Sequence, residues 1–260
     1  MIQMANTDRN NPTNNENIDL VSEVGGRCPM PGCNAELMQE KNNRTIKNYE
    51  IAHIYPHSPT TIEQNILNGV PLLYKNSPDE KENLIALCVS CHSRFDNTRT
   101  KDEYMELYNK KLQVLKNNEI TNILNNHKLQ DEIESVIKAI VNITSIATEN
   151  DLNYDPVTID KKLKSVLLIN KVRGMVQPYY LFIDEQFKSF GLNDNQYRSI
   201  LMTFKHAYVD ISARESDEQK IFLYLVNWLQ TESKISDRIA NEVLISYFIQ
   251  HCEVFDVISK

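Results

Sequence analysis

The chain has 260 residues, of which 41% are hydrophobic and 24% are charged, proportions typical of a globular protein. This composition excludes a wholly disordered chain, and the 6 glycines and 9 prolines exclude a collagen-like or low-complexity architecture. The net charge of −7 provides no broad basic surface, so any contact with nucleic acid must be local, metal-assisted or partner-assisted. No apolar run approaches a membrane span of roughly 18 residues, and no secretory signal opens the chain. We therefore expect a cytoplasmic protein without membrane association.

The chain begins with an asparagine-rich stretch, residues 1–20, that has few apolar residues. Such a composition buries too little surface to offset the entropy of ordering, so it predicts a disordered tail. Residues 21–112 differ, because they contain close cysteine pairs, a short β-prone run at Tyr49–Tyr55 and turn signals at several prolines. We expect a small module there, with too little apolar sequence for a large core of its own.

Four of the five cysteines form two close pairs, Cys28 with Cys33 and Cys88 with Cys91. In a cytoplasmic protein such pairs are more often metal ligands than disulfides. Four thiolates complete the tetrahedral coordination of one Zn²⁺, which predicts a structural zinc site that holds the module together. The fifth, Cys252, lies alone in an apolar segment and is interpreted as a small buried residue.

The third region, residues 113–260, is dominated by apolar residues at helical spacing and has few breakers. A long or broken helix, with apolar residues at 107–124, leads into it. The pattern predicts further helices over 133–141, around 163–169, over 179–190 after Pro178, and from Asp194, Ser216 and Ser236 onward. We therefore expect an α+β protein in which a small zinc-stapled module precedes a mostly helical domain.

Two segments of the module carry a more specific pattern. Residues Ala52–Pro56 read A-H-I-Y-P, and residues Asn83–His92 read N-L-I-A-L-C-V-S-C-H. Their order and content resemble the zinc-stapled members of the HNH endonuclease family, which carry a ββα-metal finger between two cysteine knuckles. The resemblance covers about residues 25–100.

This resemblance implies phosphodiester hydrolysis assisted by a divalent ion, Mg²⁺ or Mn²⁺, in addition to the structural zinc. His53 is implied as the general base that takes a proton from water. Asn83 is implied to orient His53 or to help coordinate the ion through its carbonyl oxygen. His92 is implied as a ligand or phosphate contact, and Arg94 as a clamp on a phosphate of the nucleic acid.

The sequence departs from the family pattern in two places. Many members have Asp or His directly before the first catalytic histidine, where this chain has Ala52. The ion therefore needs another ligand, and His92, Asp96 and Glu50 are the candidates. The 29 residues between His53 and Asn83 also exceed the spacing of compact members, and residues 60–80 are predicted to form an inserted helix and loop.

The end of the chain carries a second resemblance. Phe248–Phe255 reads F-I-Q-H-C-E-V-F, similar to the end of a C-terminal domain of bacterial ABC-three-component defence systems, which include Lamassu-like systems. The resemblance spans about residues 115–260. It implies a domain that docks a nuclease effector onto an SMC-like ATPase of the ABC type and an accessory subunit.

Together these features predict an endonuclease that cleaves double-stranded DNA of an invading phage or plasmid within a multi-subunit defence complex. Two alternatives stay open at this point. One is an HNH nuclease that cleaves RNA, and the other is a non-catalytic zinc module that scaffolds a complex. The oligomeric state, a homo-oligomer included, is also left open by the sequence.

Overall fold

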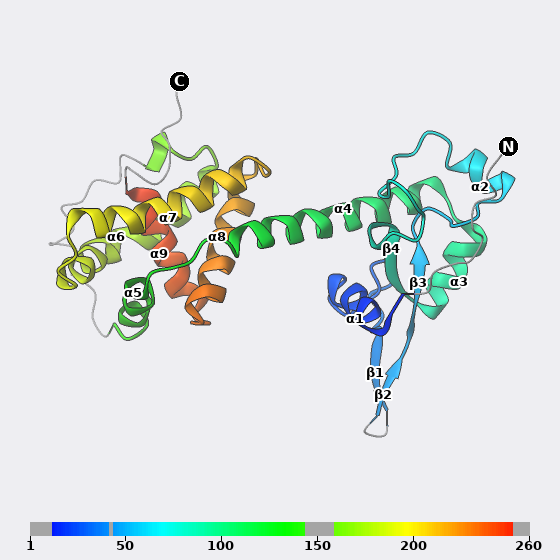
Figure 1. The fold of residues 1–260 in the computed structure, drawn as a ribbon, viewed down its shortest axis with the longest axis horizontal. Coiled ribbons are helices and arrows are strands. Elements are labelled where there is room, and N and C mark those ends of the chain that lie inside the picture. The colour runs from blue at the N-terminus through cyan, green and yellow to red at the C-terminus, as the bar shows by residue number, and fades with distance from the viewer. Residues whose placement is uncertain (1–11, 42–43, 144–158, 252–260) are drawn as a thin grey trace. The chain divides into compact units, whose positions relative to one another are not determined.

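A computed structural model describes residues 12–41, 44–143 and 159–251 of the chain (Figure 1). The chain divides into two units, residues 1–117 and 118–260, and each has its own hydrophobic core. The predicted fold class, a small α+β module followed by a mostly helical region, is confirmed. Among the described residues, no helix combines the length and the apolar character needed to cross a membrane.

The first unit is built around two strands and a helix. Strands β3 (Tyr49–His53) and β4 (Leu84–Cys88) pair antiparallel, with Tyr49 opposite Cys88 and His53 opposite Leu84. Helix α3 (Val89–Thr98) follows β4 directly and packs against both strands. All five residues of β4 are buried, and Phe95 of α3 is fully buried with them. This ββα unit places the end of β3 and the start of α3 in one compact module.

Helix α1 (Asn14–Glu23) begins within the segment predicted to be a tail. The prediction of disorder over residues 14–20 is therefore wrong. Thr13 and Glu16 form a capping box that satisfies free backbone N–H groups at the start of the helix. Leu20 is fully buried in the core of the first unit. This one apolar contact anchors the helix, although the segment as a whole has few apolar residues.

The remaining elements of the first unit surround the ββα core. They are the hairpin of β1 (Met38–Lys41) and β2 (Arg44–Lys47), helix α2 (Thr61–Ile66), the 3₁₀ turn η1 (Lys81–Asn83) and helix α4 (Lys101–Leu124). Helix α2 falls in the predicted insertion between β3 and β4. Helix α4 contributes Tyr104 and Leu107 to the core of this unit and continues without a break past Asn117, where the two units divide. The boundary expected from sequence, after residue 112, also falls within this uninterrupted helix.

The second unit consists of helices that surround a buried one. Its elements are α5 (Asp131–Val141), the 3₁₀ turn η3 (Ile159–Lys161), α6 (Val166–Ser189), α7 (Asp194–Ser212), α8 (Glu218–Ser233) and α9 (Arg238–Gln250). Helix α9, red in Figure 1, packs against α5, α6 and α8, and each of its residues from Ala240 to Gln250 is buried. A helix that is buried on all sides forms the centre of a domain core.

Two details of the helical region differ from the predicted pattern. Pro178 does not separate two helices but lies inside α6, which is continuous from Val166 to Ser189. The apolar face of α6 continues past Pro178 from Val176 to Ile183, and packing of this face against α9 outweighs the lost backbone hydrogen bond. The last three helix caps are Asn193, Asp217 and Asp237, adjacent to the predicted residues. Cys252 lies outside the described residues.

Candidate active site and metal centre

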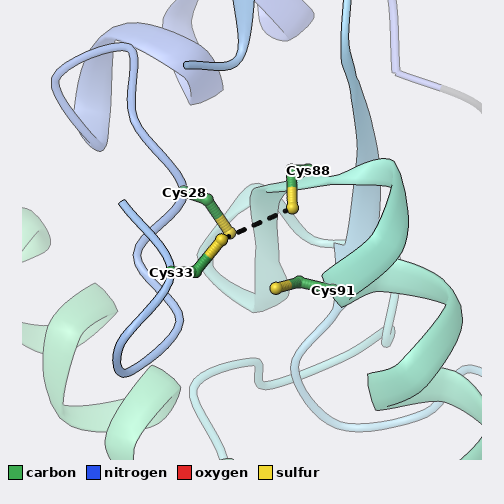
Figure 2. Close-up of side chains that lie close together, drawn as sticks. All are labelled: Cys28, Cys33, Cys88 and Cys91. Carbon is green, nitrogen blue, oxygen red and sulfur yellow. Dashed lines mark hydrogen bonds between the residues drawn. The ribbon is translucent and has the colours of Figure 1, made fainter. Parts of the chain in front are cut away.

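Four cysteines from two separate segments converge in the first unit. Cys28 and Cys33 lie on the loop between α1 and β1, whereas Cys88 ends β4 and Cys91 lies in the first turn of α3 (Figure 2). The loop turns tightly between its two cysteines, because Gly32 adopts a left-handed conformation with φ of 73°. None of the four forms a disulfide.

The spacing of these sulfur atoms fits a tetrahedral metal ion. All four lie within 4.8 Å of one another, and the Sγ atoms of Cys33 and Cys88 are 3.7 Å apart (Figure 2). Four thiolates at the usual zinc–sulfur distance lie about 3.8 Å from one another. The sulfur cluster therefore matches the size of a Zn(Cys)₄ site, and its closed donor set suits a structural role.

The thiols of this cluster do not share one environment. Burial raises the pKa of the Cys28 and Cys91 thiols, because a thiolate loses hydration away from water. The backbone N–H of Ala35 lowers the pKa of Cys33, since a hydrogen bond to sulfur stabilises the thiolate. A divalent cation would hold all four as thiolates, because metal binding displaces thiol protons.

His53, the predicted general base, ends strand β3 and is almost fully buried. Its Nε2 atom lies 2.8 Å from Oδ1 of Asp79. The other carboxylate oxygen of Asp79 lies 3.5 Å from Nε2 of His57. An ionised carboxylate only accepts hydrogen bonds, so in the neutral ring of His53 Nε2 carries the proton and Nδ1 carries the basic lone pair.

Asn83 holds together the two segments that supply His53 and Asp79. Its side-chain oxygen accepts from the backbone N–H of Tyr55, two residues after His53. Its side-chain nitrogen donates to the carbonyl oxygens of Tyr55 and Pro78, the latter adjacent to Asp79. In the described structure these bonds join main-chain groups, so Asn83 acts on His53 by positioning the surrounding backbone.

A buried arginine that sequence reasoning did not select lies beside His53. The Arg99 guanidinium, 3% exposed, donates to the backbone oxygen of His53 and to the carboxylates of Glu63 and Asp96 at 2.9 to 3.2 Å. Burial lowers the pKa of this guanidinium, while Asp96 and Glu63 oppose the shift. Arg99 therefore ties α2, α3 and the end of β3 together.

These side chains line a pocket of about 350 Å³ in the first unit. It is lined by His53, Pro56, His57, Ser58, Glu63, Asp96 and Arg99. The buried His53 side chain thus faces an open, largely polar space with two carboxylates and a guanidinium around it.

The three candidate ligands that could replace the one missing at Ala52, namely Glu50, His92 and Asp96, lie close to one another. Nδ1 of His92 lies 2.9 Å from the carboxylate of Glu50 and 3.6 Å from that of Asp96. The Ala52 position is fully buried in the core and offers no ligand atom. Carboxylate oxygens suit Mg²⁺ or Mn²⁺, whereas an imidazole is a more usual ligand of softer divalent ions. Among the described residues, only the four cysteines form a compact metal-sized group. Asp96 also bonds Arg99, which links this cluster to the pocket beside His53.

Arg94, the predicted phosphate contact, is not among the residues that line the pocket. It lies on α3 with its side chain half exposed, and it pairs with Glu103 at 3.1 Å. Sequence reasoning missed Asp79, Arg99 and Glu63. The only local signal for Asp79 is the turn at Pro78 within the insertion, and nothing in the sequence indicates that this turn folds back onto His53.

Comparison with known proteins gave two family matches. Residues 28–100 match a model of the HNH endonuclease family, and residues 120–255 match the model of C-terminal domain 11 of the ABC-three component systems. The first match contains the four cysteines, His53, Asp79 and Arg99. The second covers more than half of the chain. No curated protein and no solved structure matched the chain.

Proposed function

Because the chain belongs to the family with C-terminal domain 11 of the ABC-three component systems, and its first unit carries an HNH endonuclease match, we propose that it is the nuclease effector of such a defence system. The observation that carries this proposal is the buried His53–Asp79 pair at the edge of an open pocket inside the HNH match. A general base needs this combination of an oriented imidazole and access for substrate.

In the proposed reaction, His53 accepts the proton of the attacking water on Nδ1, while Asp79 holds the ring and stabilises its protonated form. Glu50, His92 and Asp96 hold a divalent ion, Mg²⁺ or Mn²⁺. When bound, this ion supplies positive charge for the phosphate and the leaving oxygen. Arg99 keeps the His53 carbonyl, Glu63 and Asp96 in place.

The proposed substrate is double-stranded DNA of an invading phage or plasmid. The net charge of −7 supports control by the complex, because a weak electrostatic attraction leaves the free effector largely off chromosomal DNA. Low affinity of the isolated chain for DNA at physiological salt is therefore expected. Tight, salt-insensitive binding by the free chain would contradict this part of the proposal.

The helical unit is proposed to dock the effector onto an SMC/ABC-type ATPase and an accessory subunit. Exposed apolar side chains support this role: Val166, Leu167 and Ile239 are each more than 60% exposed. A groove of about 200 Å³ between α6 and α8 lies beside Leu167 and is lined largely by apolar residues, including Phe222. Exposed apolar residues next to a groove are typical of a protein interface.

Digestion assays separate the proposed substrate from the alternatives. Plasmid DNA and total RNA are incubated in parallel with the chain, alone and with its partner subunits. Cleavage of plasmid alone supports a DNA nuclease, whereas cleavage of RNA alone supports the RNA-cleaving alternative. If the scaffold alternative holds, His53→Ala leaves every activity of the complex unchanged, while loss of a zinc ligand unfolds the module.

A further inference from the structure

The β1–β2 hairpin extends away from the core of the first unit as a two-stranded ribbon (Figure 1). No other strand pairs with it within the described residues. All four residues of β2 are exposed, and so are the described side chains of β1. An isolated two-stranded ribbon is only marginally stable in water. The exposed ribbon therefore adds little to the hydrophobic core, and stabilisation of the core does not explain why the ribbon is there.

The register of the ribbon separates its residues into two faces. Gln39 is paired with Ile46, and Lys41 with Arg44, so these positions share one face. Met38 with Lys47, and Glu40 with Thr45, occupy the other. The first face contains two basic positions and no acidic one, whereas the only acidic residue of the ribbon lies on the second.

The first face places two basic positions directly opposite each other at the end of the ribbon. Like charges at directly paired positions of two strands destabilise the pair. No carboxylate in the described part of the chain forms an ion pair with Arg44, and the other described basic residue, Lys47, lies 4.5 Å over the ring of Tyr49 on the opposite face. The ribbon thus carries two facing basic positions in a chain whose net charge is −7.

We propose that this ribbon binds the DNA duplex that the nuclease cleaves, with Lys41 and Arg44 contacting its phosphates. The inference rests on the proposed nuclease function and adds a second contact surface to it. The major groove, about 12 Å wide, admits a two-stranded β-ribbon. The side chains of Gln39 and Ile46 on the same face suit hydrogen-bonding and apolar contacts in that groove. The ribbon thus supplies the local basic contact that an acidic nuclease needs.

The ribbon is joined to the catalytic strand in a way that lets both reach one duplex. Only Asn48 separates the end of β2 from the start of β3, and β3 ends at His53. The nine residue steps from Arg44 to His53 span at most about 30 Å in extended form. This length corresponds to about nine base pairs of duplex. A duplex held in the pocket can therefore reach the ribbon within one helical turn.

A protein strand added to the ribbon edge is the competing occupant. Strand addition relies on backbone hydrogen bonds along an exposed edge, and charged residues at an edge discourage it. The basic positions at the tip, Lys41 and Arg44, therefore favour a polyanion over a protein strand. The same residues raise affinity for phosphates through release of bound counterions.

The test measures equilibrium binding, not cleavage. The full chain is titrated with a fluorescent duplex of about 20 base pairs, without added divalent ions, between roughly 50 and 200 mM salt. The ribbon variant is Lys41→Gln/Arg44→Gln, and the control is Lys101→Gln/Lys110→Gln, which removes the same charge from helix α4. Zinc content and circular dichroism verify that both variants are folded.

The ribbon variant is expected to bind more weakly and to reduce the slope of log K against log salt by up to about 1.8, because each lost phosphate contact accounts for about 0.9. The control should retain the wild-type slope. Equal slopes for the two variants would overturn the proposal, as would no binding by the wild type at the lowest salt. The proposal would also be overturned if the ribbon substitutions weakened binding of a single-stranded oligonucleotide as much as binding of the duplex. It would equally be overturned if they weakened binding of the partner subunits and left binding of the duplex unchanged. If the chain does not cleave DNA but its salt slope still depends on the ribbon residues, the proposed nuclease function is wrong and DNA binding by the ribbon stands.

Discussion

His53 and Asp79 are 26 residues apart in the sequence, and the imidazole Nε2 of His53 lies 2.8 Å from a carboxylate oxygen of Asp79. The two side chains are about one-tenth exposed or less. Asn83 holds the two residues in this contact, because its side-chain amide forms hydrogen bonds with the backbone of Tyr55, near His53, and of Pro78, next to Asp79. Asp79 is therefore the positioning residue of the proposed base, although no motif identifies it.

Asp79→Asn should lower the rate of DNA cleavage by roughly 10- to 100-fold, because the amide no longer holds His53 in one tautomer or stabilises its protonated ring. Single-turnover cleavage measures this, with Asp102→Asn, an exposed carboxylate of α4, as the control. Zinc content should be equal in both variants. A wild-type rate for Asp79→Asn would show that this carboxylate does not act on His53.

Glu50→Gln and Asp96→Asn should each raise the Mg²⁺ or Mn²⁺ concentration needed for half-maximal cleavage. Both carboxylates lie next to His92, and removal of one charged ligand weakens a hard-cation site. The measurement is a metal titration of cleavage, with Glu106→Gln on α4 as the matched control. Identical metal dependence in all of these variants would place the ion elsewhere.

Cys88→Ser should unfold the first unit and leave the second unit helical. Structural zinc contributes on the order of 10 kcal/mol to small modules, more than this small core can replace. Zinc content by mass spectrometry and proteolysis of each unit measure the effect, with Ser90→Ala, an exposed neighbour, as the control. A folded, active Cys88→Ser protein that lacks zinc would contradict a structural role for the metal.

The stability of the second unit should decrease above about pH 10. Burial, together with the neighbouring Tyr197, raises the pKa of Tyr247 in the folded state. The unfolded chain therefore ionises this phenol first, so its contribution to stability is complete below the unfolded pKa and is lost as the pH rises above it.

Comparison of the wild type with Tyr247→Phe isolates this contribution from that of other titrating groups. At pH 8 the wild type should be more stable, because the hydroxyl groups of Tyr197 and Tyr247 lie 2.9 Å apart and form a hydrogen bond. The difference in the free energy of unfolding should shrink at higher pH. If the difference in the free energy of unfolding stays constant between pH 8 and pH 11, ionisation of Tyr247 does not cause the loss of stability.

The features that were predicted correctly from the sequence depend on short-range patterns of residues. The two cysteine pairs reveal the metal-sized cluster because each knuckle is a short turn, and the helical stripes reveal α7 and α8 because apolar spacing is a local property. The A-H-I-Y-P and N-L-I segments locate His53 and Asn83 for the same reason.

The features that escaped prediction depend on tertiary contacts. Asp79 meets His53 only because an inserted loop folds back, and Arg99 becomes part of the pocket only because α3 packs on β3. Arg94, five residues earlier, has the same chemistry but faces Glu103. Pro178 reads as a helix end, yet packing on both sides of it keeps α6 continuous.

His53 is proposed as the base of a phosphodiester hydrolase, and cleavage of supercoiled plasmid with Mg²⁺ or Mn²⁺ tests this role most directly. Wild type and His53→Ala are compared at equal zinc content, alone and with the ATPase and accessory subunits. The wild type is expected to nick and linearise the plasmid, and His53→Ala is expected to do neither. Equal cutting by the two proteins, or no cutting by the wild type even in the complete complex, would contradict it.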